Sequence, residues 1–291
     1  MSRIAYVNGR YLPQRDASVN IEDRGYQFAD GVYEVVHLYQ DRFIDCDRHM
    51  ARLERSLGEI RVTPPMGRDA MLHVLREVAR RNRVTDGILY MQITRGVSRR
   101  DHAFPIKPVV PAMVVTVRRL PPYPSNVEKW ATAAVTHADE RWARCDIKSV
   151  GLLANVLAKQ AAREAGAYEA ILIDAAGQVT EGSSTSAWIV DAEGVLRTRF
   201  LDHNILPGCT RDALLALLGE ERIVVSETSF TEADLRSARE VFVSSASSFV
   251  KPIVSLDGAK VGSGEVGPIT RRLFDLFARH VKGDLANSPR A

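Results

Sequence analysis

The sequence has few cysteines and no long apolar run. Its three cysteines, Cys46, Cys145 and Cys209, lie far apart, and no two of them form a Cys-x-x-Cys pair. This spacing indicates neither a disulfide framework nor a zinc site, and it suits a reducing compartment. No window approaches the length of a membrane span, and residues 1–9 lack the apolar stretch of a signal peptide. We therefore expect a cytoplasmic protein with no metal site and no membrane segment.

Concentrated positive charge is also missing. The net charge is only +3, although an isoelectric point of about 8.8 would by itself be compatible with nucleic-acid binding. Lysines and arginines are scattered among acidic residues, and no basic tract is interleaved with aromatic residues. We therefore expect no nucleic-acid partner. A non-catalytic phosphate- or nucleic-acid-binding protein is the alternative from a different functional class.

The length of 291 residues suggests one large domain or two smaller ones. The clearest break is the segment 120–126, where Pro121, Pro122 and Pro124 forbid a helix and discourage a strand. We predict an N-terminal domain over residues 1–120, a linker over 121–126, a C-terminal domain over 127–282 and a disordered tail over 283–291.

Local patterns predict a mixture of strands and helices. Asn8-Gly9 is the strongest short hairpin signal and predicts a hairpin over residues 4–12, whereas the polar stretch 23–31 is expected to be a loop. Alternation predicts a strand over 32–39, and helical spacing predicts helices over about 46–60 and 69–82. The second half alternates between strands and helices. Its helices are expected from Lys148 to about residue 165, over 210–218, after a cap at Thr231, and over 268–282.

The segment 262–267 matches the pattern Gly-x-Gly-x-x-Gly and precedes a predicted helix. A dinucleotide site would need a second strand after that helix and an acidic residue to bind the ribose. The sequence ends after this one helix, so we interpret the glycines as a loop between a hairpin and the last helix.

Lys148 is the first residue with a possible chemical role. It lies in the stretch 144–149, at the expected start of a helix. Burial lowers the pKa of a lysine, and the neutral amine is a nucleophile that can form a Schiff base with a carbonyl. A single lysine of this kind is more often a surface residue, so the interpretation depends on the other motifs.

Glu181 stands in a hydroxyl-rich turn, residues 180–186. This turn could be an exposed polar hairpin. It could equally place an acid beside the ring nitrogen of pyridoxal phosphate, which needs such a partner to act as an electron sink.

Two further segments could bind a phosphate. Residues 206–211 open a predicted helix, whose free amides and dipole favour anions, and Thr210 adds a hydroxyl. The serine-rich turn 244–248 follows a short strand, and Arg52 could add charge. Arg100 and His102 could together bind a carboxylate, although a solvated basic loop is an equal interpretation.

Taken in order, these motifs resemble the D-amino-acid aminotransferase branch of the class IV (fold-type IV) pyridoxal-phosphate aminotransferases. The lysine and Glu-Gly-Ser motifs are shared across class IV, whereas Tyr33, Arg100 and His102 point to the D-amino-acid branch. The matching segments, which span residues 4 to about 280, are Asp23–Phe28, Gly31–Val36, Arg100–His102, Arg144–Ser149, Leu157–Gln160, Tyr168–Leu172 and Thr180–Ser184.

The resemblance implies an α/β (α+β) two-domain fold, with a smaller N-terminal α/β domain and a larger C-terminal domain that has a mixed, barrel-like sheet and flanking helices. It implies a homodimer with the active site in the interdomain cleft. The reaction would be transamination between D-amino acids, such as D-alanine and D-glutamate, and 2-oxo acids, such as 2-oxoglutarate and pyruvate.

The resemblance also implies roles for single residues. Lys148 would be the Schiff-base lysine and proton shuttle, and Glu181 the partner of the ring nitrogen. Tyr33, Arg100 and His102 would form the trap for the substrate carboxylate, partly across the dimer, with Ser183 and Ser184 as further substrate contacts. The cofactor would be held by Arg52, Leu206, Cys209, Thr210, Ser245 and Ala246.

One position departs from the family pattern. The site of Ala246 often carries a threonine whose hydroxyl reaches the phosphate, and here only the backbone amide can donate. Within the same fold the alternatives are a branched-chain L-amino-acid aminotransferase, an (R)-selective amine transaminase and, less favoured, an aminodeoxychorismate lyase, which should lack the Arg-x-His trap.

Overall fold

The computed structural model describes residues 3–283, so the predicted tail lies, apart from Gly283, outside the described residues. The chain separates into two compact units. The first contains the described residues up to Pro122 together with Ile147–Gly151. The second contains Tyr123–Asp146 and the described residues from Leu152 onward.

The first unit is built on a six-stranded antiparallel sheet with the order β2-β1-β6-β5-β3-β4. The predicted hairpin is confirmed, since Asn8 and Gly9 adopt the positive φ values of 46° and 89° that this tight turn requires. The Asn8 side chain also accepts a hydrogen bond from the backbone N–H of Met113, which fastens the hairpin to β6. The strands are β1 (Ile4–Val7), β2 (Arg10–Pro13), β3 (Gly31–Tyr39), β4 (Arg42–Phe43), β5 (Gly87–Thr94) and β6 (Ala112–Arg119).

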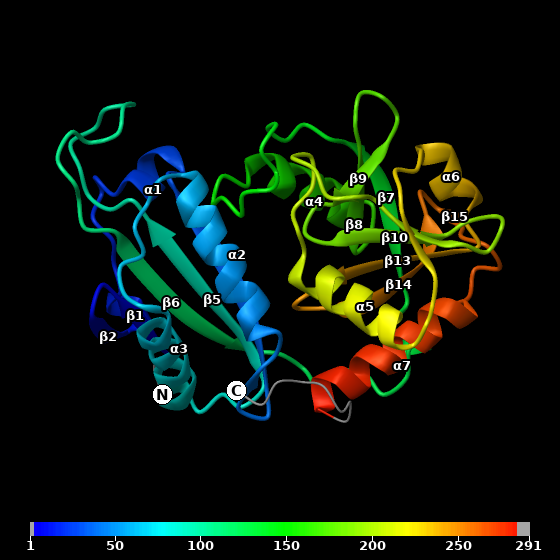
Figure 1. The fold of residues 1–291 in the computed structure, drawn as a ribbon, viewed down its shortest axis with the longest axis horizontal. Helices are drawn as coiled ribbons and strands as arrows, with labels where there is room; N and C mark the ends of the chain where they lie inside the picture. The colour runs from blue at the N-terminus through cyan, green and yellow to red at the C-terminus, as the bar shows by residue number, and fades with distance from the viewer. Residues whose placement is uncertain (1–2, 284–291) are drawn as a thin grey trace. The chain divides into compact units, whose positions relative to one another are not determined.

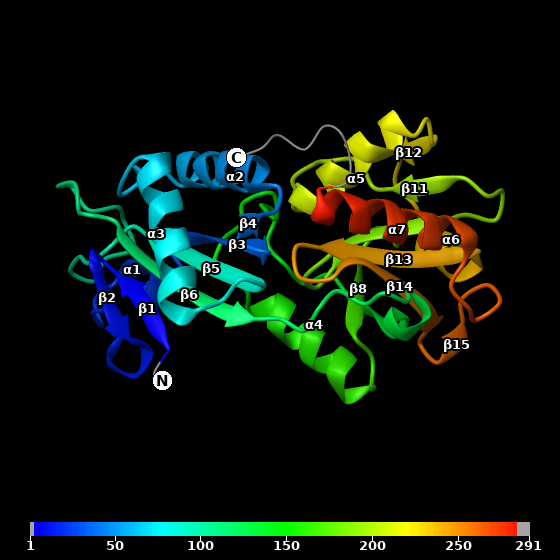
Figure 2. The ribbon, with the colours of Figure 1, turned by 90° about the horizontal axis from the view of Figure 1, so that it is seen from below.

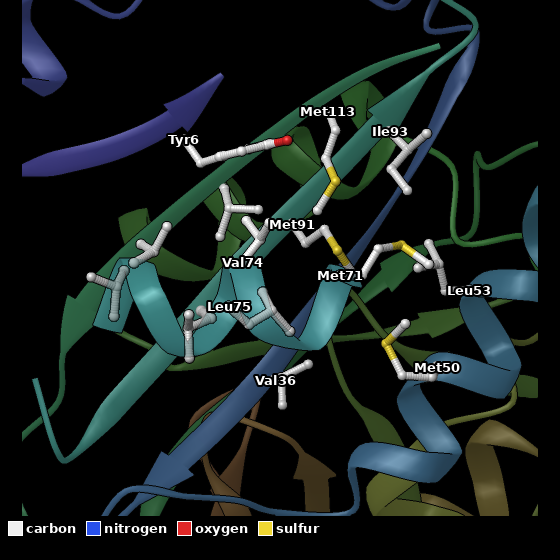
Figure 3. Close-up of a cluster of buried hydrophobic side chains, with 14 of the residues drawn as sticks. Tyr6, Val36, Met50, Leu53, Met71, Val74, Leu75, Met91, Ile93 and Met113 are labelled. Carbon is white, nitrogen blue, oxygen red and sulfur yellow. The ribbon is translucent and has the colours of Figure 1, made fainter. Parts of the chain in front are cut away.

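Two long helices, α2 (Cys46–Glu59) and α3 (Arg68–Asn82), cover one face of this sheet (Figure 2). Met50, Leu53 and Leu57 of α2 recur at helical spacing and are buried, as the periodicity predicts. Figure 3 shows side chains of both helices pointing toward Met91 and Ile93 of β5, so the core of this unit lies between the helices and the sheet.

One prediction for this unit is wrong. The stretch 23–31, expected to be a loop, contains a short helix, α1 (Arg24–Phe28); a 3-10 turn, η1 (Gln14–Asp16), lies before it in the chain. Asp23 caps α1, because its side chain accepts a hydrogen bond from the Gly25 N–H at 2.8 Å. Asp23 is a typical N-cap residue, but Gly25 and the polar residues around it favoured the prediction of a loop.

A second prediction fails at Lys148, which does not begin a helix. The helix α4 starts five residues later and spans Leu153–Glu164. The backbone before it pairs with β3 instead: the Tyr33 N–H donates to the Lys148 carbonyl at 3.0 Å, and the Val150 N–H donates to the Gly31 carbonyl at 3.1 Å. These bonds require an extended chain and place the segment in the first unit, whereas the sequence suggested a continuous C-terminal domain.

The second unit is built on a nine-stranded mixed sheet whose main path is β12-β11-β10-β13-β14-β7-β8-β9, with β15 beside β14. β7 runs parallel to β14 and β8, and β11 runs parallel to β12. β9 also contacts β10, so the sheet curls into a half-barrel. The strands are β7 (Thr132–Ala138), β8 (Glu169–Ile173), β9 (Val179–Gly182), β10 (Ser186–Val190), β11 (Leu196–Thr198), β12 (Val225–Glu227), β13 (Glu240–Ser245), β14 (Phe249–Leu256) and β15 (Ala259–Lys260).

Helices flank this sheet on both sides. α5 (Cys209–Glu220) and α7 (Pro268–Lys282) pack against β13 and β14, and α4 packs against β7 and β8 (Figures 1 and 2). A 3-10 turn, η2 (Glu128–Trp130), precedes β7. The cap predicted at Thr231 is confirmed, since Thr231 and Asp234 form a capping box for α6 (Glu232–Ser237). In residues 3–283 no helix is long and apolar enough to cross a membrane.

The glycine pattern at residues 262–267 forms the connection to α7, as interpreted from the sequence. The N-terminal amides of that helix are occupied, because the buried Glu240 carboxylate accepts hydrogen bonds from Ile269 N–H at 3.1 Å and Thr270 N–H at 2.7 Å. A pyrophosphate would have to displace this carboxylate, so the structure gives a physical reason against a dinucleotide at this helix.

Gly267 provides a test of this cap. A Cβ at this position would lie 2.0 Å from Cδ of Glu240, so an alanine must push the carboxylate off the helix. We expect Gly267→Ala to lower the free energy of unfolding by about 2 kcal/mol. The matched control is Gly58→Ala in α2, where a Cβ meets open space and helix propensity should add about 0.5–1 kcal/mol. Thermal unfolding measures the stability of both variants. A Gly267→Ala protein as stable as the wild type would contradict the proposed role of the Glu240 carboxylate as the cap of α7.

Candidate active site

Lys148 is held in the first unit by its backbone. Its N–H lies 3.4 Å from Oγ of the buried Ser56, and its carbonyl accepts the hydrogen bond from β3. The side chain extends over an aromatic face, with Nζ 4.3 Å from the ring centroid of Tyr33. No carboxylate of the first unit's described residues forms an ion pair with this amine. The first unit's described residues therefore present this amine on a fixed backbone without an acidic partner.

Arg52, on α2, is oriented by a buried acid on β3. Its Nε and Nη2 each donate to Glu34 at 2.8 Å, and His49 Nδ1 lies 2.7 Å from the same carboxylate. Burial alone would raise the pKa of Glu34, but the charge and hydrogen bonds of Arg52 and His49 outweigh it and hold that pKa far below its usual range. The two hydrogen bonds to Glu34 thus fix the orientation of the Arg52 guanidinium.

Arg100 and His102 lie together, in the loop between β5 and β6. The Arg100 guanidinium is 5.0 Å from the ring centroid of Phe28, and the His102 ring is 5.4 Å from it. Arg24 anchors the loop by donating to the Asp101 carbonyl at 2.6 Å. Both predicted trap residues are exposed, and among residues 3–283 no hydrogen bond, ion pair or ring contact joins either of them to Tyr33. The structure therefore groups Arg100 with His102, but it groups Tyr33 with Lys148.

Glu181 lies in β9 of the second unit and is buried against Arg141. Arg141 Nη1 donates to its Oε1, and the Leu206 N–H donates to the same oxygen at 3.1 Å. An arginine can only donate, so Glu181 faces it as an acceptor, which is the role of an ionised carboxylate. The turn expected to be either an exposed hairpin or an acid site is therefore buried and electrostatically organised.

Arg141 also donates two hydrogen bonds to Asp139. Its Nε and Nη2 donate to that carboxylate at 2.9 and 2.8 Å, and the Thr180 hydroxyl donates to it at 2.7 Å. Burial works to raise the pKa of Asp139, and the hydrogen bonds and charge of Arg141 lower it further than burial raises it, so the net shift is downward. One guanidinium thus bridges the buried Glu181 and the half-buried Asp139.

The hydroxyls of the turn after Glu181 point at a different acid, Glu169. This fully buried carboxylate accepts from Ser183 Oγ, from Ser184 Oγ at 2.9 Å and from Thr185 Oγ1 at 3.0 Å. Lys159 Nζ also lies 3.2 Å away. Ser183 and Ser184, expected as substrate contacts, therefore donate their hydroxyl protons within the protein.

The two expected phosphate segments also lie in the second unit. Gly208 precedes α5, and no side chain caps the helix, whose first residues Cys209 and Thr210 are buried. The second segment is the turn from Ser245 to Ser248, between β13 and β14. Its hydroxyls are internally linked, with Ser245 Oγ 2.8 Å from Ser248 Oγ. The uncapped helix start therefore suits an anion, whereas the hydroxyls of the second segment bond to one another.

Comparison with known proteins decides the family. The sequence pattern of class IV aminotransferases matches residues 31–256. The chain is 40% identical to a D-alanine aminotransferase of Listeria monocytogenes, covering 94% of this chain and 95% of that protein. It is 39% identical to a D-alanine aminotransferase of Bacillus licheniformis, covering 97% and 98% of the two chains. The chain belongs to the class IV aminotransferase family.

A solved structure agrees on the fold. A branched-chain amino acid aminotransferase from Escherichia coli superposes on this aminotransferase with a TM-score of 0.89 and 25% identity, over 99% of this chain and 98% of that one. The predicted fold-type IV architecture is thus confirmed. The cofactor of the family is pyridoxal 5′-phosphate.

The residues of this aminotransferase fit that cofactor. In the first unit, Lys148 offers the amine. In the second unit, Glu181 offers an acceptor suited to a protonated ring nitrogen, and the uncapped N-terminus of α5 offers donors suited to a phosphate. Within the described residues no group of three or more histidine, cysteine or acidic side chains could hold a metal ion.

Sequence reasoning missed three residues that organise the site: Arg141, Glu169 and Glu34. Each is a charged side chain that is buried or nearly so, and each contacts a residue distant in the sequence. The only signal at the sequence level is that Glu34 and Glu169 lie inside stretches that otherwise read as buried strands, where an unpaired charge would be costly.

Arg141 can be tested through stability. Replacement by leucine leaves Asp139 and Glu181 buried without their cation, so we expect Arg141→Leu to lower the free energy of unfolding by about 3–5 kcal/mol at pH 7. Arg80→Leu is the control, because Arg80 is 71% exposed and solvent screens its pair with Glu77, so this substitution should change the free energy of unfolding far less.

The pH dependence of this loss has a definite sign. The pKa of Asp139 is lowered by folding, so its stabilisation is complete above the unfolded pKa of about 4 and is lost as the pH falls below it. The difference between the wild type and Arg141→Leu should therefore narrow below about pH 4. Urea unfolding from pH 3 to pH 7 measures the free energy of unfolding of both proteins. A difference between them that does not change with pH would show that Arg141 acts through packing alone.

Proposed function

We propose that this aminotransferase transfers the amino group of D-amino acids, such as D-alanine and D-glutamate, to 2-oxo acids, such as 2-oxoglutarate and pyruvate. The observation that carries the proposal is the near-full-length similarity to D-alanine aminotransferases at about 40% identity. The branched-chain enzyme shares the fold at only 25% identity, which supports the D-amino-acid substrate over that alternative.

Lys148 is the proposed covalent anchor of the cofactor and the group that moves the substrate α-proton. Bound pyridoxal phosphate supplies an electron sink for the charge left when that proton is removed. The amine of Lys148 suits both roles because its backbone is fixed by β3 and its Nζ rests over Tyr33 rather than in an ion pair of the first unit.

Glu181 is the proposed partner of the cofactor ring nitrogen, with Arg141 holding the carboxylate in place. Because Arg141 is also bound by Asp139, the guanidinium cannot move away from Glu181 without breaking a second ion pair. The remaining cofactor contacts are proposed for Arg52, Leu206, Cys209, Thr210, Ser245 and Ala246, the last through its backbone amide.

Tyr33, Arg100 and His102 are the proposed carboxylate trap, and their positions favour a homodimer. Tyr33 lies beside Lys148, whereas Arg100 and His102 are exposed on a separate loop. A trap that needs all three is complete when the loop of one subunit serves the site of its partner. We propose such a homodimer, in the cytoplasm.

Exposed apolar side chains support this assembly. Leu153, Val156 and Leu157 form one face of α4 and are 73%, 57% and 54% exposed. On the loop of Arg100, Ile106 and Val110 are exposed as well. A second copy of the chain would remove these surfaces from water.

Ser183 and Ser184 are proposed to contribute to substrate binding through the shape of their turn. Their hydroxyls are occupied by Glu169, and the Ser183 N–H and carbonyl are bonded to the Ala170 carbonyl and to Asn155 Nδ2, so these bonds set the position of the turn.

Lys148→Ala tests the reaction. We expect the variant to lose the yellow colour of the cofactor and at least about 1000-fold in activity with D-alanine and 2-oxoglutarate, because it removes both the anchor and the proton carrier. Lys129→Ala, at an exposed lysine, should be unaffected. The paired assay uses L-leucine in place of D-alanine, and a wild-type preference for L-leucine would overturn the proposed substrate.

Arg100→Ala tests the trap. Loss of a charged hydrogen bond to the substrate carboxylate should raise KM for D-alanine by about 10–100-fold, with Arg99→Ala as the neighbouring control. Steady-state kinetics at varied D-alanine measure it, and an unchanged KM would remove Arg100 from the trap.

Mixed dimers extend the Arg100 test to the assembly. If Arg100 serves the partner's site, a dimer of one Lys148→Ala subunit and one Arg100→Ala subunit has one site with both residues intact. Such a dimer should show the wild-type KM. If each loop serves its own subunit, the only site with a lysine lacks the arginine and KM stays high.

A further inference from the structure

Lys251 is a buried cation in the second unit that the proposed reaction does not use. It lies in the middle of β14 and is only 6% exposed. Among residues 3–283 no carboxylate forms an ion pair with it. Its Nζ instead lies 3.4 Å from the ring centroid of Trp130 and 4.5 Å from that of Tyr168. Two aromatic faces therefore take the place of an acid.

The same two aromatic residues contact Ser248, the last residue of the serine-rich turn. Trp130 Nε1 donates to the Ser248 carbonyl at 3.1 Å. The Ser248 hydroxyl interacts with the Tyr168 phenol and partly offsets the rise in the Tyr168 pKa that burial causes. Ser248 in turn bonds Ser245. Lys251, the two rings and the turn thus form one connected group.

This arrangement is unfavourable for a charged lysine. Burial, and then repulsion by Lys159 of α4, lower the pKa of Lys251 to about 8. Of the neighbouring groups, Glu169 is engaged by Lys159 and by hydroxyls, and Tyr168 has a pKa raised by burial. No neighbour of the group therefore supplies a compensating negative charge to Lys251.

The sign of the linkage follows from the lowered pKa. The folded state binds this proton less tightly than the unfolded state, so the fold gains stability as the pH rises from about 8 toward the ordinary lysine value of 10.5. At neutral pH the ammonium reduces stability, and an apolar side chain would be more stable there. Residues that lower stability in this way are characteristic of functional sites.

We propose that Lys251 is a positioning residue for the anion-binding turn: its ammonium holds Trp130 and Tyr168 in place, and these fix Ser245–Ser248 where the cofactor phosphate binds. The proposal rests on the phosphate role given above to Ser245 and Ala246. Neutral lysine loses the attraction to the two rings, so the turn loosens at high pH.

Cofactor release from the purified full-length protein tests this role. It is followed during dialysis by the loss of visible absorbance at pH 7 and pH 9.5, for the wild type, Lys251→Arg and Lys251→Met. Arginine stays charged at both pH values and stacks on aromatic rings, so it should preserve the interaction with Trp130 and Tyr168. Taking the ratio of wild-type to Lys251→Arg release rates cancels pH effects that arise at Lys148.

We expect this ratio to rise about tenfold between pH 7 and pH 9.5. Lys251→Met should release the cofactor about tenfold faster than the wild type at pH 7 and yet melt at a higher temperature. A ratio that does not change with pH overturns the proposal, and so does a Lys251→Met protein that folds and retains the cofactor like the wild type. If Lys251→Met does not fold, the ratio decides alone.

Two further variants separate this proposal from the proposed phosphate site. If Thr210→Ala and Ser245→Ala leave cofactor release unchanged, the phosphate assignment itself is wrong. If they accelerate release while the Lys251 variants do not, the phosphate assignment stands and only the role of Lys251 fails.

Discussion

The buried bridge of Arg141 between Asp139 and Glu181 is the interaction on which the chemistry of the second unit depends. A carboxylate removed from water is stable only when donors surround it, and Glu181 obtains two from Arg141 and the Leu206 amide. The Leu206 bond also ties Glu181 to the segment that leads into α5. The same contact therefore fixes the acid expected at the cofactor ring and the approach to the helix expected at its phosphate.

In the first unit a buried carboxylate is likewise stabilised by an arginine. Glu34 on β3 is paired with Arg52 on α2, and β3 also carries the backbone bonds that hold Lys148. One strand thus positions the amine through its main chain and the guanidinium through its side chain. The loop that carries Arg100 and His102 is held differently: Arg24 donates to the Asp101 carbonyl and Arg95 lies over the Phe104 ring, while the side chains of Arg100 and His102 stay exposed.

Local signals predicted the elements whose formation is local. The Asn8-Gly9 turn, the apolar spacing of α2 and the capping box at Thr231 each depend on neighbours within a few residues, and each is found as predicted. The error at Lys148 has the opposite origin. The apolar, helix-forming residues that follow it favour a helix, but pairing with β3, distant in the sequence, fixes the segment as extended.

The candidate site divides along the same line. Lys148 and Glu181 could be proposed from the sequence because their motifs resemble those of the family, but the residues that contact Glu181 and fix the neighbourhood of Lys148 could not. Arg141, Glu34 and Glu169 are ordinary charged residues in the sequence, and only their burial against distant partners gives them a role. Single-sequence patterns report the periodicity of burial and carry no information on which charges meet.

The serines after Glu181 show why the identity of a motif does not settle its chemistry. Read from the sequence, three neighbouring hydroxyls suggest donors for a ligand. In the structure they donate to Glu169, and the turn from Ser245 to Ser248 likewise bonds to itself. Hydroxyls used in this way rigidify the backbone around them. In both turns the hydroxyls bond within the protein, so their presence in the sequence does not by itself provide a donor to a ligand.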